Sequence, residues 1–380
     1  MKQVCRWSLL LIFVCMGWNS TAMGKVPPLT AEAYCLIDRT SGQFMLGEQE
    51  NEKRPMASTT KILTALLAAE YADPEAEATV SEQADHTAEY TAGLQQGQTI
   101  SIQDALKGAL VKSYNDAAVV LAEYVAGDEA FFAQLMTKKA FALGAVHTNF
   151  QNASGLPAEN HYSTAYDLAL LSRAALQNPT VAEIVGSPEV SFSHPGYLEA
   201  LTLCNTNPLL TSYEGADGVK TGTTNAAGKC LIASATRGDR ALIAVALHAA
   251  DRAGDCRRLL DYGFRAEERT VLTPEEELGT APVRMESGRI RKLRTVAADS
   301  LEIRGGEGDI SVERRIQPCS HLLPPVLAGE SAGQVQVWLN GHYFAGEELR
   351  AGEEIVEEKW FDRALGWLMQ RIYYWLVKQW

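Results

Sequence analysis

Two groups of short apolar segments lie on either side of a long helical stretch, and this arrangement limits the fold more than any other feature of the sequence. The first group, AYCLID (33–38) and QFMLG (43–47), is divided by a turn and predicts a β-hairpin. The second group, VKTGTT (219–224), KCLIASAT (229–236) and ALIAVAL (241–247), predicts an antiparallel meander. Because helices lie between the two groups, we expect the first and last segments to share one sheet.

The intervening stretch, from about 102 to 185, has helical periodicity, for example in DALKGALVKSYNDAAVVLAEYVA. We therefore predict an α/β fold over residues 29–268, in which helices flank an antiparallel sheet and an all-helical subdomain is inserted. The acidic stretch TPEEELG (273–279) predicts a junction. Beyond it, short strands broken by Gly and Pro predict a small β-rich domain at 280–355.

The N-terminus has the three-part pattern of a secretory signal. Lys2 and Arg6 precede an apolar run at 7–18, and the small residues Ser20, Thr21 and Ala22 come after it. The run is short for a membrane span. We expect residues 1–22 to be a cleaved signal peptide and the mature protein to be secreted; the alternative is an uncleaved anchor.

The C-terminal segment KWFDRALGWLMQRIYYWLVKQW (359–380) predicts an amphipathic helix. Its apolar face comprises Phe361, Ala364, Leu365, Leu368, Ile372, Trp375 and Leu376. Tryptophan and tyrosine are typical of the bilayer interface, and the segment is locally basic. We predict that it attaches the protein to the outer face of the cytoplasmic membrane. The alternative is a helix that packs on the β-rich domain or forms a dimer.

The net charge of −13 over 380 residues makes nucleic acid an unsuitable partner, because phosphate binding requires a positive field. The histidines form no HExxH or other ligand pair, so we expect no metal and no cofactor.

The stretch ASTTKILTALLAAE (57–70) places Ser58 three residues before Lys61 at the start of an apolar helix. Residues at i and i+3 share a helix face, so the two side chains can touch. A buried lysine has a lowered pKa and can act as the base that a serine nucleophile requires. The alternative is a helix cap beside a surface lysine.

Two further patterns strengthen the catalytic interpretation. Ser113-Tyr114-Asn115 lies within the helical region, where a helix N-cap is the alternative interpretation. Lys220-Thr221-Gly222-Thr223 opens the meander, and a glycine inside a strand indicates that something approaches the backbone closely. Two lysines facing one cleft would repel each other, which favours a neutral Lys61 and a cationic Lys220.

These three motifs resemble those of the penicillin-binding and serine β-lactamase superfamily. The segments 54–70, 113–116, 152–157 (NASGLP), 164–169 (TAYDLA) and 215–236 resemble the secreted serine-type D-alanyl-D-alanine carboxypeptidases, the low-molecular-mass penicillin-binding proteins. The resemblance is close over residues 29–265 and looser over the β-rich domain and the tail.

The resemblance implies that the substrate is a peptidoglycan stem peptide ending in D-Ala-D-Ala, and that β-lactams are covalent inhibitors. Ser58 would be the nucleophile and Lys61 its base, while Ser113 would relay a proton to the leaving D-alanine. Asn115 would hold the substrate amide and Lys61. Among the substrate-binding residues Lys220, Thr221, Gly222 and Thr223, the first two would bind the terminal carboxylate. The backbone N–H groups of Ser58 and Thr223 would form the oxyanion hole.

The alternatives differ in the fate of the acyl-enzyme. A β-lactamase of the commonest class would need an E-x-x-L-N pattern to hydrolyse it quickly, and this pattern does not occur between Asn115 and Lys220. A D,D-transpeptidase or endopeptidase of the same superfamily shares all the motifs. A non-catalytic wall-binding or morphogenetic protein could keep the fold without turnover.

Overall fold

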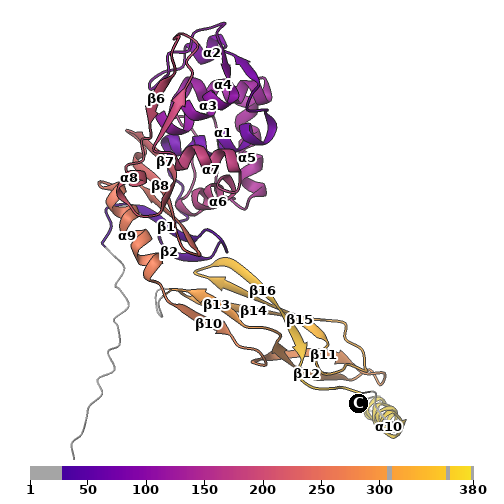
Figure 1. Cartoon of the computed structure of the whole chain (residues 1–380). Helices are drawn as coiled ribbons and strands as arrows, with labels where there is room; N and C mark the ends of the chain where they lie inside the picture. The colour runs from indigo at the N-terminus through magenta and orange to yellow at the C-terminus, as the bar shows by residue number, and fades with distance from the viewer. Residues whose placement is uncertain (1–27, 306–309, 357–359, 378–380) are drawn as a thin grey trace, which may run out of the picture.

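The computed structural model describes residues 28–305, 310–356 and 360–377, so the predicted signal peptide lies outside the described residues. Two domains and a C-terminal helix succeed one another along the chain (Figure 1).

A five-stranded antiparallel sheet with the order β2-β1-β9-β8-β7 forms the centre of the first domain. Its strands are β1 (Ala33–Asp38), β2 (Phe44–Glu48), β7 (Ala216–Thr224), β8 (Gly228–Arg237) and β9 (Arg240–Leu247). Pairing of β1 with β9 joins the N-terminal hairpin to the meander. The prediction that the two ends of the domain share one sheet is therefore confirmed.

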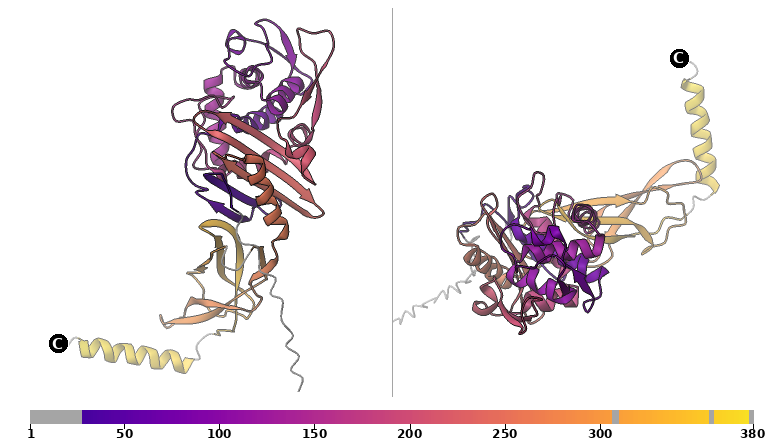
Figure 2. Two further views of the ribbon diagram at one scale, coloured as in Figure 1. Left: turned by 90° about the vertical axis from the view of Figure 1, so that its left-hand side faces the viewer. Right: turned by 90° about the horizontal axis from the view of Figure 1, so that it is seen from above.

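Both faces of this sheet are covered, which explains why β9 is apolar without alternation. Ile243 and Val245 pack among the helices that connect the two groups of strands. Leu242 and Ala244 face the other way and pack with the helix α9 (Arg252–Arg265) (Figure 2). Strands buried on both faces are expected to form such continuous apolar runs.

The connecting helices gather on one side of the sheet (Figure 1). They are η1 (Ala57–Thr60), α1 (Lys61–Tyr71), α2 (Glu82–Asp85), α3 (Ile102–Lys107), η2 (Gly108–Lys112), α4 (Asn115–Ala126), α5 (Glu129–Ala142), α6 (Ala165–Ala175) and α7 (Pro179–Gly186). The short helix α8 (Leu209–Ser212) lies on the other side, where Leu209 packs with α9. Side-chain caps begin several of these helices, as when Asp128 accepts from the N–H of Phe131.

The predicted helical stretch is broken at Ser113 and again between α5 and α6. Two small two-stranded antiparallel sheets that the sequence did not predict are β3 (Glu77–Thr79) with β4 (Thr99–Ser101), and β5 (Glu189–Phe192) with β6 (Leu201–Cys204).

The second domain is β-rich. Its larger sheet has the order β11-β12-β16-β15-β14, and β10 pairs with β13 beside it. The strands are β10 (Glu268–Leu272), β11 (Glu277–Arg284), β12 (Ile290–Ala297), β13 (Leu301–Arg304), β14 (Val312–Pro318), β15 (Ser331–Leu339) and β16 (His342–Ala351). The helix α10 (Trp360–Val377) lies at the far end of this domain (Figure 1). No helix among the described residues combines the length and apolar character that crossing a membrane requires.

Candidate active site

Ser58 lies in η1 and Lys61 is the first residue of α1, and both adjoin β7 near Gly222. The Nζ atom of Lys61 donates to Oγ of Ser58 at 3.0 Å. Ser58 makes no side-chain cap for α1, whose N-cap residue is Thr60, and Lys61 is fully buried. The alternative of a helix cap beside a surface lysine is therefore wrong.

The environment of Lys61 favours its neutral form. Its Nζ atom also donates to Oδ1 of Asn115 and to the carbonyl oxygen of Ser154, both at 2.6 Å. Burial lowers the pKa of Lys61 well below its usual value, and the charge of Lys220 lowers it further. An amine in this state can accept the proton of the neighbouring hydroxyl.

The second motif lies at the break between η2 and α4. Ser113 has a left-handed backbone (φ 70°), and the N-cap residue of α4 is Tyr114, which makes no side-chain cap bond. The alternative of a serine N-cap is therefore wrong. Asn115 opens α4, and its Nδ2 atom donates to the carbonyl oxygen of Glu89 at 2.8 Å. That bond directs its Oδ1 atom toward Lys61.

The third motif forms the edge of the sheet along β7. Oγ1 of Thr221 lies 2.7 Å from Oγ1 of Thr206. A Cβ atom at Gly222 would lie 3.0 Å from the Met56 carbonyl oxygen and 3.0 Å from the Ser58 nitrogen. The close approach predicted at Gly222 is thus made by the segment that carries Ser58.

The charge of Lys220 differs from the sequence prediction. Lys220 is buried, and burial together with the nearby charge of Arg252 lowers its pKa to about 7. In the free protein it is therefore only partly protonated near neutral pH, whereas the sequence predicts a cation. Arg252 supplies a second positive charge at the same place.

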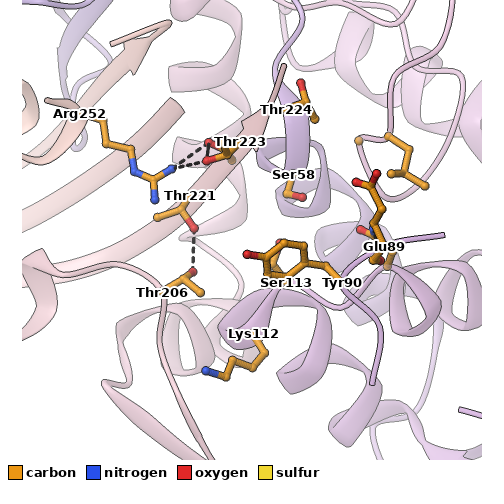
Figure 3. Close-up of a pocket in the computed structure, with 14 residues that line it drawn as sticks. Ser58, Glu89, Tyr90, Lys112, Ser113, Thr206, Thr221, Thr223, Thr224 and Arg252 are labelled. Atoms are coloured by element: carbon orange, nitrogen blue, oxygen red, sulfur yellow. Dashed lines mark hydrogen bonds between the residues drawn. The ribbon is translucent and has the colours of Figure 1, made fainter. Parts of the chain in front are cut away.

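Arg252 and several other cleft residues were not predicted as site residues. The motif residues Ser58, Ser113, Asn115, Thr221, Gly222 and Thr223 line one cleft of about 250 Å³, with Glu89, Tyr90, Lys112, Thr206 and Arg252 among their neighbours. Figure 3 shows Arg252 on one side of Ser58 and Glu89 on the other. Nη1 of Arg252 donates to the Gly222 carbonyl oxygen and to Oγ1 of Thr223, both at 2.9 Å. Arg252 enters from α9, and no local motif surrounds it in the sequence.

This arrangement suits acyl transfer to a serine. It combines a hydroxyl with an amine of lowered pKa at hydrogen-bond distance. It also places Arg252 in the cleft, where an anionic group of a substrate can be bound, while Lys220 is buried next to the cleft and donates to the Thr221 carbonyl oxygen at 3.2 Å. Within the described residues, no group of three or more His, Cys, Asp or Glu side chains could hold a metal ion.

Comparison with known proteins agrees with this geometry. Residues 20–251 match the peptidase S11 family, described as D-alanyl-D-alanine carboxypeptidase. The chain is 31% identical to the D-alanyl-D-alanine carboxypeptidase DacF of Bacillus subtilis, over 86% of each chain. It is also 31% identical to DacC of Escherichia coli, an enzyme of the same name, over 97% of this chain and 95% of that one. The crystal structure of penicillin-binding protein 5 from Haemophilus influenzae superposes with a TM-score of 0.64 at 26% identity, covering 88% of this chain and all of that one.

Proposed function

Because the chain belongs to the peptidase S11 family and is a serine-type D-alanyl-D-alanine carboxypeptidase, we propose that Ser58 is its nucleophile and Lys61 the general base. The observation that carries this assignment is the 3.0 Å contact between Lys61 Nζ and Ser58 Oγ. A fully buried lysine with a lowered pKa can take the serine proton without a histidine.

In the first step, Ser58 Oγ attacks the carbonyl carbon between the two terminal D-alanines, and its proton passes to Lys61 Nζ. The C–N bond then breaks, and the leaving amine takes a proton that Ser113 relays from Lys61. Water attacks the resulting acyl-enzyme, which releases the shortened peptide and restores the Ser58 hydroxyl. Asn115 positions Lys61 through the 2.6 Å bond to Oδ1 and faces the substrate amide.

The part of the cleft that is lined by Thr221 and Arg252 binds the terminal carboxylate of the substrate. Lys220 and Thr221 provide a cation and a hydroxyl, and Arg252 adds a charge beside them. The backbone N–H groups of Ser58 and Thr223 stabilise the oxyanion that develops during attack. A β-lactam, which presents a strained amide next to a carboxylate, acylates Ser58 in the same way and blocks the site.

The two ends of the chain determine where the enzyme works in the cell wall. Residues 1–22 direct secretion, residues 29–268 form the catalytic domain, and residues 280–355 form a small β-rich domain. The α10 helix lies on the outer surface of the cytoplasmic membrane. Its described side chains include several that are exposed and aromatic, namely Trp367, Tyr373, Tyr374 and Trp375. Deletion of residues 359–380 should remove most binding to liposomes; unchanged binding would contradict this attachment.

Mass spectrometry after mixing with benzylpenicillin tests the catalytic assignment. We expect a covalent adduct on Ser58 that is absent in Ser58→Ala. With a pentapeptide mimic and an added amine, the ratio of free tetrapeptide to amine-linked tetrapeptide then distinguishes hydrolysis from transfer, because D-alanine is released in both reactions. A folded protein that forms no adduct, or an adduct on another serine, would contradict the assignment.

A further inference from the structure

The β11–β12 hairpin is strongly basic in an acidic chain. Residues 284–294 contain five cations, Arg284, Arg289, Arg291, Lys292 and Arg294, and one carboxylate, whereas the whole chain has a net charge of −13. All five cationic residues are exposed. A local positive field of this kind is not explained by the catalytic site, which lies in the other domain.

The register of the hairpin places three of these five charges on one face, whereas Arg291 pairs with Val283 on the other. Ile290 pairs with Arg284, and Arg294 pairs with Thr280. Since paired residues of antiparallel strands point to the same face and alternate residues share it, Arg284, Ile290, Lys292 and Arg294 lie together. The opposite face carries Leu293, which is buried in the core of the domain. Ile290, at the tip, is 64% exposed although it is apolar.

Further exposed apolar side chains lie at the same end of the domain. They are Leu323, Leu327 and Val356, at 65%, 51% and 53% exposure. The backbone of Arg284 donates to the Leu322 carbonyl oxygen at 2.9 Å, and Val326 pairs with Ile355. The segment that carries these side chains therefore adjoins the hairpin.

The chain also leaves for α10 from this end. Arg294 Nη2 donates to the Gly352 carbonyl oxygen at 2.6 Å, just beyond the end of β16. Figure 2 shows the hairpin and α10 at the end of the β-rich domain that is remote from the catalytic domain. The Glu353 carboxylate accepts from the Arg294 backbone N–H at 3.2 Å, and with the exposed Glu286 and Glu354 it reduces the net positive charge of this end without cancelling the five cations.

We propose that this end of the β-rich domain, which we call the basic tip (residues 284–294, 322–327 and 356), binds the surface of an anionic phospholipid bilayer. Phosphate headgroups attract the cations, while the exposed apolar side chains enter the interface. A soluble polyanion would satisfy the charges but leave the apolar side chains in water, which favours a bilayer. This contact goes beyond the attachment through α10 and does not depend on it, and it would fix the orientation of the β-rich domain on the membrane.

Vesicle sedimentation of the full mature chain, with α10 intact, tests this contact. The triple variant R284Q/R289Q/K292Q removes three charges from the basic tip, and K53Q/K138Q/R265Q removes three exposed charges from the catalytic domain as the matched control. Each cation near an anionic surface strengthens binding roughly five-fold. We therefore expect the first variant to lose at least ten-fold in partitioning to vesicles containing phosphatidylglycerol, and the control to lose less than three-fold. Ile290→Ser should also weaken binding, because it removes apolar contact rather than charge.

The acylation of each variant by benzylpenicillin should stay at the wild-type level, which shows that the protein is folded. The proposal would be overturned by wild-type vesicle binding in the triple variant, or by an equal loss in the control. It would also be overturned if the triple variant lost binding to soluble polyphosphate while its vesicle binding stayed unchanged. The vesicle results do not depend on the catalytic roles, and because α10 is identical in all variants, differences among them report on the basic tip.

Discussion

At the scale of single residues, the mechanism that we propose depends on two lysines whose charges must differ. Lys61 must be neutral to accept a proton, and Lys220 must be charged to bind a carboxylate. Burial lowers the pKa of both, and for Lys220 the value is about 7. The sequence motif supplies the two residues but not this balance, because it depends on burial and on Arg252, which is distant in the sequence.

The pH dependence of kcat/KM should therefore be bell-shaped for a substrate with a free terminal carboxylate. Activity rises with pH as Lys61 loses its proton and falls above about pH 7 as Lys220 loses its charge. The charge of Arg252 lowers the pKa of Lys220, so Arg252→Gln should move the alkaline limb to higher pH while raising KM. Release of D-alanine measured from pH 5 to about 10 provides the profile.

Arg257→Gln is the matched control, because Arg257 lies on the same helix but is exposed outside the cleft. It should leave the profile unchanged. An alkaline limb at the same pH in Arg252→Gln and in the wild type would show that Lys220 does not determine it.

Glu89 is expected to contribute to the choice of substrate. It is exposed and lies across Ser58 from Arg252 (Figure 3). A peptide whose carboxylate binds beside Arg252 would extend its upstream residues toward Glu89. Peptides with a free amine upstream of D-Ala-D-Ala should therefore react faster than N-acetylated ones, and Glu89→Gln should reduce this preference by about three- to five-fold, as expected for an exposed ion pair.

The ratio of kcat/KM values for the two peptides measures this preference. Glu159→Gln removes a charge from an exposed position outside the residues that line the cleft, and it should leave the ratio unchanged. Equal ratios in Glu89→Gln and in the wild type would exclude the contact.

At the scale of structural elements, the spacing of η1 and β7 should set the geometry of the oxyanion hole that we propose. Gly222→Ala would place a Cβ atom 3.0 Å from the Ser58 nitrogen and from the Met56 carbonyl oxygen, so the strand must shift away from η1. Loss of one aligned oxyanion donor lowers rates by about 10²–10³-fold. We expect the rate of acylation of Gly222→Ala by benzylpenicillin, measured by rapid quench, to fall by about 10²–10³-fold.

Lys229→Ala is the control for this variant, since Lys229 is exposed on the neighbouring strand and pairs with Thr223. Thermal unfolding should remain cooperative in both variants. Acylation of Gly222→Ala at the wild-type rate would mean that the separation of η1 and β7 does not limit the reaction.

The elements that could be predicted from the sequence are those with strong periodicity. Apolar runs bounded by turn residues predict β1, β2 and the meander β7–β9, and the long periodic stretch predicts helices. The two small two-stranded sheets were missed because strands of three or four residues carry too little pattern. The break at Ser113 was missed because a left-handed residue between η2 and α4 results from tertiary packing, not from local preference.

The site was predictable to the extent that its residues lie in compact motifs. Ser58, Lys61, Ser113, Asn115 and Thr221 could be found in this way, and the structure brings them to one cleft. Thr206 and Arg252 could not, because each is a single polar residue that reaches the cleft from another element. Only the tertiary structure brings Arg252 of α9, and Thr206 from the loop that follows β6, into contact with β7.

At the scale of the whole molecule, the two domains meet through a small set of contacts. The buried side chain of Gln43 exchanges two hydrogen bonds with the Arg304 backbone, at 2.6 and 2.9 Å. At the start of β16, the ring of His342 lies 4.8 Å from the ring of Phe44 and 3.8 Å from that of Tyr166. These contacts link β13 and β16 to β2 and α6, so they determine how the catalytic cleft is held above the β-rich domain.

The double variant Gln43→Ala/His342→Ala removes these hydrogen bonds and ring contacts, together with the 3.4 Å contact of His342 with Glu50. Among the polar contacts identified between the described residues of the two domains, it leaves only the Arg304–Asp38 ion pair at 3.5 Å, so it should uncouple the domains. We expect calorimetry to show two separated unfolding transitions, with the lower one shifted down by about 4 °C or more. Hydrolysis of a soluble peptide should stay within two-fold of wild type, since neither residue lines the cleft. Tyr343→Ala is the control, because its ring contacts Trp338 within the β-rich domain. If the double variant still unfolds in one transition that coincides with the control, these contacts do not couple the domains, and the orientation of the cleft must depend on the direct connection from α9 to β10.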